Sequence, residues 1–335
     1  MQLRIALIVV STLLLATRPA AASGYDSRPE ARAFAADVAQ RRQWDSAWVL
    51  AQLREAKLRP AAQKLIMPPP VGQPKNWAAY RDRFVEPRRI LAGTEFWKAN
   101  AAALARAEER FGVPPEVVVG IVGVETFYGR VMGNFRALDV LATLAFDFPP
   151  GRSDRSAYFR EELEELLVLA QREKVAPATL KGSFAGAIGL GQFMPGSINR
   201  HALDFDGDGH VDLTGSSTDA IGSIANFLAL HGWQRGLPAT HPVTPPTDAA
   251  ALARLLAPDI VPSFDAAAMA AAGAALTDAG RGHTGLLALV MVENGHLPPS
   301  YSAGTANFYT LTRYNRSSYY ALAVLALGEA VKASL

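Results

Sequence analysis

One carboxylic acid in the sequence stands in a strongly apolar setting. Ile121, Val122 and Gly123 precede Glu125, and Tyr128 comes three residues after it. At helical spacing Ile121, Val122 and Tyr128 share the face that carries the carboxyl group. Burial penalises the ionised form, so the pKa of Glu125 should rise. Such a group can donate a proton near neutral pH.

The residues alone leave two interpretations of Glu125 open. It can form an ion pair with Arg130 or Arg136, a common explanation of a buried carboxylate. It can instead be a general acid, and breaking a glycosidic bond usually takes a second carboxyl group. Asp139 and Asp147 are possible, but both lie beside loop or helix-cap signals. An acid acting alone would need a nucleophile from its own substrate.

A second group of chemistry-bearing residues forms an acidic loop that begins at Asp204. Oxygen-bearing side chains occupy positions 1, 3, 5 and 9, and Gly209 stands at position 6, where such a loop turns sharply. This is the first part of an EF-hand calcium loop. Position 12 is Gly215 instead of Glu, which leaves the closing ligand open; a turn without metal is the alternative. The predicted ligands of a structural Ca²⁺ are Asp204, Asp206, Asp208, the backbone carbonyl of His210, Asp212 and Asp219.

Helices should position both groups. Pro115 suits the first turn of the helix that carries Glu125, and Asp219 is expected to cap a helix that ends before Gly232. A short apolar run at 285–292 predicts a strand. The expected fold class is therefore mainly α (α+β). Apolar residues recur at three- and four-residue spacing at 31–38, 44–56, 96–111, 116–127, 161–173, 219–231 and 317–332.

Composition excludes several classes of protein. The chain has 335 residues, 50% hydrophobic and 19% charged, which excludes intrinsic disorder. It has no Cys, which excludes disulfides, thiolate zinc sites, a Cys nucleophile and lipid attachment through an N-terminal cysteine. No His-Glu-x-x-His motif supports zinc hydrolysis. No organic cofactor is expected.

The first 22 residues have the order of a secretory signal. A short positive start is followed by an apolar run at 5–16, too short to span a bilayer comfortably, and then by small residues. Two of the 33 basic residues lie there, so 31 basic and 31 acidic residues remain, and charge favours neither nucleic acid nor an anionic membrane as partner. We expect a periplasmic protein without a membrane span after cleavage; an uncleaved anchor is the alternative.

Long blocks in a fixed order resemble the lytic murein transglycosylase B family (glycoside hydrolase family 103). The resemblance covers roughly residues 30–330 and is more specific than a single short motif. It implies a lysozyme-like catalytic domain. The blocks are 113–116, 121–126, 138–144, 181–195, 219–223 and 307–315. The expected organisation is a signal peptide at 1–22, an N-terminal helical region at 23–110, the catalytic core with the acidic loop at 111–240, a small mixed insertion at 241–300 and a C-terminal segment at 301–335 that returns to the core.

The resemblance also implies roles for single residues. It makes Glu125 the sole catalytic acid/base. The implied substrate-binding residues are Ser183, Gln192, Phe193, Met194, Tyr158, Tyr314, Asn315 and Tyr320. Tyr and Met can pack on the apolar faces of sugars while Gln, Asn and Ser bind their polar groups. Without the resemblance, Tyr314 and Tyr320 would be ordinary core aromatics of a terminal helix, and 186–191 a packing loop.

The implied activity is cleavage of the β-1,4 bond between N-acetylmuramic acid (MurNAc) and N-acetylglucosamine (GlcNAc) in peptidoglycan glycan strands. The C6 hydroxyl of MurNAc can attack its own C1 and leave a 1,6-anhydro ring. Glu125 would first protonate the leaving oxygen and then accept the proton of that hydroxyl. The alternatives are a muramidase-type hydrolase that uses water, a non-catalytic peptidoglycan-binding protein and a calcium-dependent interaction module.

Overall fold

We describe a computed structural model of the chain, which covers residues 24–68, 72, 74–151 and 153–335. The predicted signal peptide lies outside these residues. The chain divides after Lys57 into two compact units, and each is described by itself. The smaller unit is helical, with Ala35, Val49 and Leu53 fully buried. Its elements are η1 (Tyr25–Ser27), α1 (Pro29–Arg42) and α2 (Ser46–Glu55).

The larger unit consists mainly of helices, which confirms the expected fold class. Its core is formed by α7 and α8, whose residues are apolar on almost every side, and by the apolar stripe of α9. The helices are α3 (Pro60–Leu65), α4 (Trp77–Asp82), α5 (Pro87–Ala99), α6 (Ala101–Phe111), α7 (Pro115–Thr126), α8 (Ala137–Phe146), α9 (Ser156–Arg172), η2 (Pro177–Thr179), α10 (Pro195–His201), α11 (Ser217–Leu230), α12 (Ala249–Leu256), α13 (Ala266–Ala271), α14 (Asp278–Arg281), α15 (Ala306–Tyr314) and α16 (Ser318–Lys332).

Two helical predictions were wrong in detail. The helix expected at 96–111 is interrupted at Asn100, whose backbone leaves the helical region and whose side chain bonds to the Phe96 carbonyl. The cap of α11 is Ser216, not Asp219: the Ser216 hydroxyl accepts the N–H of Asp219 at 3.1 Å. The carboxylate of Asp219 turns instead toward the acidic loop and accepts backbone N–H groups there, including that of Phe205 at 2.7 Å.

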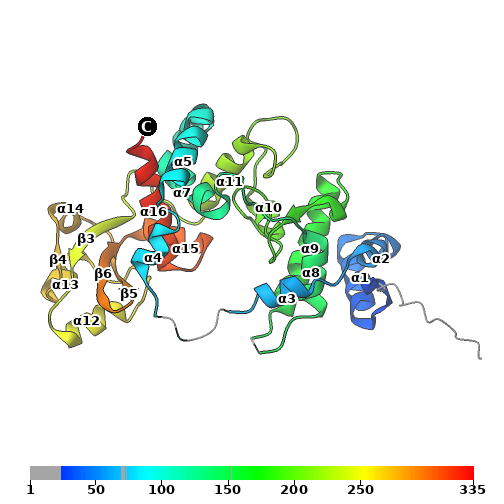
Figure 1. Cartoon of the computed structure of the whole chain (residues 1–335), viewed down its shortest axis with the longest axis horizontal. Coiled ribbons are helices and arrows are strands. Elements are labelled where there is room, and N and C mark those ends of the chain that lie inside the picture. Colours follow the sequence, from blue (N-terminus) through cyan, green and yellow to red (C-terminus); the bar gives the residue numbers. More distant parts are fainter. Residues whose placement is uncertain (1–23, 69–71, 73, 152) are drawn as a thin grey trace, which may run out of the picture. The chain divides into compact units, whose positions relative to one another are not determined.

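Helices α7 and α16 pack unusually closely because glycines stand where they meet. A Cβ added to Gly120 would clash with the backbone carbonyl of Val324, and one added to Gly328 would clash with that of Glu116. Without a side chain at these two positions, the backbones approach directly. Figure 1 shows α16, in red, beside α7. The C-terminal helix therefore reaches the helix that carries Glu125, although the two lie far apart in the sequence.

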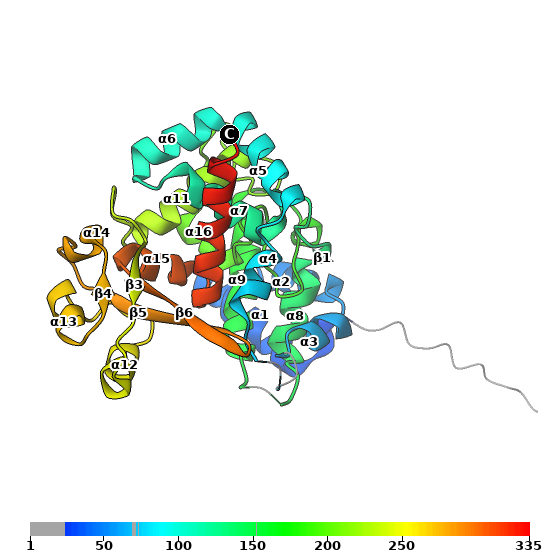
Figure 2. The same cartoon turned by 60° about the vertical axis from the view of Figure 1, so that its left-hand side comes forward.

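The part of the chain between α11 and α15 forms a small sheet. Its strands pair antiparallel in the order β4-β3-β6-β5, and β5 and β6 form a long hairpin (Figure 2). Leu255, Met269, Leu287 and Ala303 belong to the core that it shares with its short helices. The strand predicted at 285–292 is present as β5, shifted toward the C-terminus. The strands are β3 (Thr240–Thr244), β4 (Ala275–Leu276), β5 (Ala288–Asn294) and β6 (Leu297–Gly304), and a separate pair is formed by β1 (Phe135–Arg136) and β2 (Lys181–Gly182).

Helices long and apolar enough to cross a membrane do not occur in the part of the chain that the structure describes.

Candidate active site

Glu125 lies in the last turn of α7, where the chain leaves the helix in a strained conformation. Phe127 and Tyr128 follow with φ of 52° and 57°, so two consecutive residues with side chains occupy the left-handed region. Each such residue costs free energy, and such strain gathers at functional sites. The hydroxyl of Thr126 donates to the Leu190 carbonyl at 2.9 Å. This bond ties the end of the helix to the loop that follows β2.

The environment of Glu125 brings the pKa of its carboxyl group close to neutral pH. Burial raises the pKa of its carboxyl group from 4.5 to about 7, and the Tyr320 hydroxyl opposes this by donating to Oε1 at 2.6 Å. The two arginines that were considered as ion-pair partners of Glu125 each pair with a different acid. Arg130 is 3.4 Å from Glu95, and Arg136 is 3.7 Å from Asp139. The structure thus favours the interpretation of Glu125 as an acid over that of an ion pair.

No second carboxyl group of the described residues contributes to the pKa shift of Glu125, whose causes are burial and the Tyr320 hydroxyl. Asp139 is fully buried on α8, where the Arg59 side chain donates to its Oδ2 with Nε at 2.9 Å. Asp147 ends α8, and its backbone carbonyl accepts from Gln63. Neither Asp139 nor Asp147 is among the causes of the pKa shift of Glu125.

Tyrosine hydroxyls lie near Glu125 from three different helices. The charge of Glu125 contributes to raising the pKa of Tyr80, Tyr314 and Tyr320, although burial is the larger cause for each. Tyr314 and Tyr320 stack, with ring centroids 6.4 Å apart and an interplanar angle of 9°. The Tyr314 hydroxyl donates to the Gly191 carbonyl at 2.6 Å. The two tyrosines therefore make specific hydrogen bonds in addition to packing in the core.

Tyr80 was missed by the sequence reasoning. It projects from α4, a helix of six residues that begins soon after a proline-rich stretch. The signal that would have found it is a run of aromatics at helical spacing, Trp77, Tyr80 and Phe84. Their rings are in contact, with centroids 6.5 Å apart for Trp77 and Tyr80 and 5.2 Å apart for Tyr80 and Phe84.

The loop from Ser183 to Met194 is held by its own polar side chains. The Ser183 hydroxyl accepts the N–H groups of Ala185 at 3.3 Å and Ala187 at 3.1 Å. Gln192 is left-handed, with φ of 52°, and its Nε2 donates to the carbonyls of Met132 and Gly189 at 3.1 and 2.9 Å. Because both protons of the Gln192 amide are used, its Oε1 remains as an acceptor.

A cavity of about 400 Å³ brings five of the expected substrate-binding residues together, and three lie elsewhere. Burial, followed by the charge of Glu162, raises the pKa of the Tyr158 hydroxyl to about 12, so it stays neutral and is hydrogen-bonded to Glu162. Ser183, the exposed Asn315 and Tyr320 do not line this cavity. The five residues on its wall are Tyr158, Gln192, Phe193, Met194 and Tyr314.

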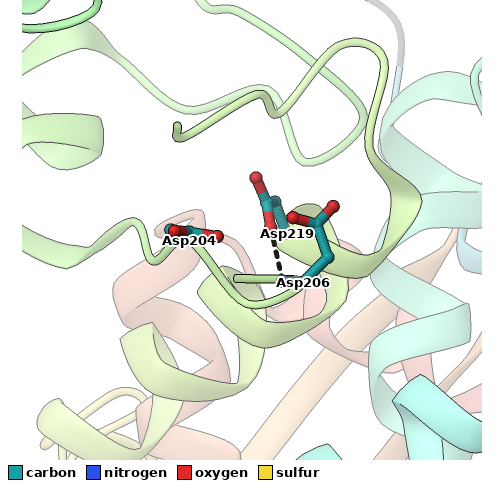
Figure 3. Close-up of side chains that lie close together, drawn as sticks. All are labelled: Asp204, Asp206 and Asp219. Carbon is teal, nitrogen blue, oxygen red and sulfur yellow. Dashed lines mark hydrogen bonds between the residues drawn. The ribbon is translucent and has the colours of Figure 1, made fainter. Parts of the chain in front are cut away.

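The acidic loop gathers three of its carboxyl groups. Ligand oxygens of Asp204, Asp206 and Asp219 all lie within 4.8 Å of one another (Figure 3). Asp219, sixteenth in the loop, thus occupies the place of the closing residue. The Asp208 and Asp212 side chains stand outside this group, where each accepts backbone N–H groups of the loop itself. The side chain of His210 lies 3.5 Å from Glu173.

Hard oxygen ligands at this spacing fit a calcium ion better than a softer metal. Three carboxylates this close repel one another unless a cation neutralises them. The loop also reaches the site: the carbonyl of Leu213, within the loop, accepts the N–H of Leu190 at 2.8 Å. The carbonyl of Leu190 in turn accepts from Thr126, the neighbour of Glu125.

Comparisons with known proteins show the family to which the chain belongs. The profile of the transglycosylase SLT domain matches residues 26–329. The chain is 44% identical over 268 residues to the membrane-bound lytic murein transglycosylase B of Escherichia coli K12, covering 78% of this chain and 69% of that protein.

Solved structures show the same fold. The E. coli lytic transglycosylase Slt35, solved in complex with calcium, has a TM-score of 0.80 and 38% identity, over 93% of this chain and 96% of that one. SltB3 from Pseudomonas aeruginosa, solved with NAG-anhNAM-pentapeptide, has a TM-score of 0.76 and 28% identity, over 90% of this chain and 78% of that one. With its lysozyme-like helical fold, the chain belongs to the lytic murein transglycosylases, a family of lyases that act on peptidoglycan.

Proposed function

We propose that Glu125 is the single acid/base with which this transglycosylase cleaves the MurNAc-β-1,4-GlcNAc bond and leaves a 1,6-anhydro-MurNAc end. The observation that carries the proposal is a carboxyl group whose pKa is raised to about 7 and whose shift has no second carboxyl group among its causes in the described residues. A carboxyl group with that pKa is protonated often enough to donate and ionised often enough to accept.

The proposed reaction returns Glu125 to its starting state. Its proton passes to the glycosidic oxygen, the bond from that oxygen to C1 of MurNAc breaks, and the GlcNAc side leaves as an alcohol. The C6 hydroxyl of the same MurNAc then bonds to C1, and its proton passes to the carboxylate. Tyr320 donates to Oε1 at 2.6 Å, which orients the carboxyl group and stabilises it while it is ionised.

The glycan strand would bind along the cavity whose wall includes Tyr314, the ring that stacks on Tyr320, the donor to Glu125. Tyr158, Met194 and Tyr314 supply rings and a thioether for the apolar faces of the sugars. The free Oε1 of Gln192 is suited to accept from a sugar hydroxyl or an N-acetyl N–H. Ser183 and Asn315, which do not line the cavity, remain proposed binding residues because the family resemblance implies that role.

We propose that Asp204, Asp206 and Asp219 hold a structural Ca²⁺, with Asp208, Asp212 and the carbonyl of His210 as the remaining predicted ligands. The close grouping of the first three carboxyl groups supports this. The metal would neutralise the loop and stiffen the segment that ends at the Leu213 carbonyl. It has no part in the proton transfers.

Export to the periplasm is proposed from the signal-like first 22 residues. The E. coli relative is described as membrane-bound, whereas this chain has no cysteine for a lipid anchor. The expected organisation of the remaining chain, with regions at 23–110, 111–240, 241–300 and 301–335, is likewise proposed. The β3–β6 sheet supports a separate mixed region, although its strands extend a few residues past the expected limits.

Digestion of purified sacculi followed by mass spectrometry tests the reaction. Anhydro ends are the expected products, and reducing ends would show a hydrolase that uses water. Binding without any soluble product would show a non-catalytic protein. The Glu125→Gln variant should lose activity by several orders of magnitude, while Glu95→Gln, which removes an exposed carboxylate paired with Arg130, should keep it. Full activity of Glu125→Gln would remove Glu125 from its role.

A further inference from the structure

The turn that follows Glu125 needs support from outside α7. Phe127 and Tyr128 have positive φ values of 52° and 57°, a conformation that costs free energy for residues with side chains. Such a turn persists only where the surrounding structure holds it. Helix α5, which packs against α7, carries Arg89 in its first turn. The contacts of Arg89 therefore bear on the position of the Glu125 carboxyl group.

The guanidinium of Arg89 binds the last turn of α7. Its Nη1 donates to the Gly123 carbonyl at 2.9 Å, and the same carbonyl accepts the N–H of Phe127 at 3.2 Å. Gly123 lies two residues before Glu125. The last carbonyls of a helix carry partial negative charge, so a cation that donates to one of them stabilises this end of the helix. Arg89 therefore holds the backbone of the turn that carries Glu125.

The same guanidinium contacts the ring of Phe127. Its central carbon lies 4.6 Å from the centre of this ring and 5.1 Å from the centre of the Phe84 ring. The guanidinium of Arg130 lies 5.1 Å from the centre of the Phe127 ring as well. A cation over an aromatic ring is attracted to it. Phe127 is therefore held by cations from α5 and from the loop after α7 while its backbone is in the left-handed region.

Tyr128, the second left-handed residue, fills the space between α5 and α7. A Cβ added to Gly93 of α5 or to Gly123 of α7 would lie 2.5 Å from the Tyr128 hydroxyl. The ring therefore fits there only because both residues lack a side chain. Burial raises the pKa of the Tyr128 hydroxyl, and the charge of Arg89 opposes this shift. Arg89 and Tyr128 thus support the same turn from the α5 side.

The charge of Arg89 stands partly buried beside α7. Burial lowers the pKa of its guanidinium, and the charges of Glu86 and Tyr128 oppose that shift. Glu86 caps α5, where its carboxylate accepts the N–H of Arg88 at 2.9 Å. The charge of Arg89 is not among the causes of the pKa shift of Glu125. Arg89 therefore acts on Glu125 through the backbone of α7 and not through direct electrostatic attraction.

We propose that Arg89 is a positioning residue for Glu125, which keeps the carboxyl group aimed at the glycosidic oxygen by holding the Gly123 carbonyl and the Phe127 ring. The inference rests on the proposed function. A proton transfer requires its donor and acceptor within hydrogen-bond distance, and a misplacement of about 1 Å can slow a reaction about a hundredfold. Arg89 does not line the cavity in which we expect the glycan, so its loss should lower kcat and leave KM unchanged.

Steady-state kinetics on soluble glycan strands test this role. Arg89→Met should lower kcat on the order of tenfold and keep KM within about twofold of the wild-type value. Arg89→Lys, which retains a positive charge and a donor for the Gly123 carbonyl, should recover part of the lost kcat. Arg88→Met, which changes the exposed neighbour on α5, is the matched control and should leave kcat and KM unchanged.

Phe127→Leu provides a second variant and should lower kcat by less than Arg89→Met, because the hydrogen bond from Arg89 to the Gly123 carbonyl remains. Urea unfolding of each variant defines conditions in which it is folded, and the kinetics are measured there. An unchanged kcat in Arg89→Met, a raised KM with unchanged kcat, or no recovery in Arg89→Lys would overturn the inference. A wild-type protein that releases no anhydro products would instead contradict the proposed function.

Discussion

Replacing Glu125 by Gln should change stability in a way that depends on pH. The wild-type carboxyl group has a pKa of about 7 in the folded protein and 4.5 as its ordinary value. Between these values the folded state holds a proton that the unfolded state releases, so the free energy of unfolding falls as pH rises through this window. Below pH 4.5 both states are protonated, and above pH 7 both are ionised.

The size of the effect follows from the shift. One pKa unit corresponds to about 1.4 kcal/mol, so the wild-type protein loses about 3 kcal/mol of stability between pH 4.5 and 7 on account of this group. That value is an upper bound because the side chain keeps some contact with solvent. Gln has nearly the same shape and does not titrate. The free energy of unfolding of Glu125→Gln minus that of the wild type should therefore increase by about 1–3 kcal/mol between pH 4 and pH 8.

Urea unfolding followed by tryptophan fluorescence at both pH values, at one calcium concentration, measures this difference. Glu95→Gln is the control, because its exposed carboxylate should give nearly the same difference from wild type at both pH values. A stability difference for Glu125→Gln that is the same at pH 4 and pH 8 would refute the reasoning. It would mean that the carboxyl group is not held in an environment that penalises its charge.

Three further predictions follow from the packing and hydrogen bonds. Tyr320→Phe removes the hydrogen bond that lowers the pKa of Glu125, so the alkaline limb of the pH profile of kcat/KM should move up by about one unit; a limb that stays in place or moves down would contradict this. Gly120→Ala places a methyl group against the backbone of α16 and should cost about 1–3 kcal/mol of unfolding free energy. Gly282→Ala, whose methyl group would meet its neighbours at ordinary van der Waals distance, should be near neutral in the same urea experiment. Calcium at 100 times its Kd should stabilise the wild type by about 2.7 kcal/mol and raise its melting temperature, and Asp219→Asn should abolish most of that rise; an unchanged rise would place the metal elsewhere.

The sequence predicted correctly those features that depend on residues close together in the chain. The apolar face around Glu125 predicted a raised pKa, and the alternation of acids from Asp204 predicted a loop that gathers carboxyl groups. Asp139 and Asp147 were predicted beside helix-cap signals, and they lie in the first turn and at the C-terminal end of α8. Each of these features depends on residues within a few positions of one another, which helical or loop geometry brings together.

What depends on distant residues could not be derived from local patterns. The bond between Glu125 and Tyr320 joins positions 195 residues apart, and only the family resemblance linked them. Tyr80 reaches Glu125 through the docking of α4, which no spacing rule predicts. The prediction that Asp219 caps α11 was wrong. Ser216 and Asp219 are both good capping residues, and the Asp219 carboxylate is taken up by backbone N–H groups of the acidic loop, which leaves the cap to Ser216.

The glycine contacts between α7 and α16 make the proton donor dependent on the end of the chain. Glu125 is synthesised before Tyr320, so the Tyr320 hydroxyl can donate to Glu125 only after α16 has been made and has packed against α7. An unfinished or C-terminally trimmed chain would carry the acid without its partner. The hydrogen bond on Glu125 therefore depends on the docking of α16 against α7, which the glycines at their contact permit.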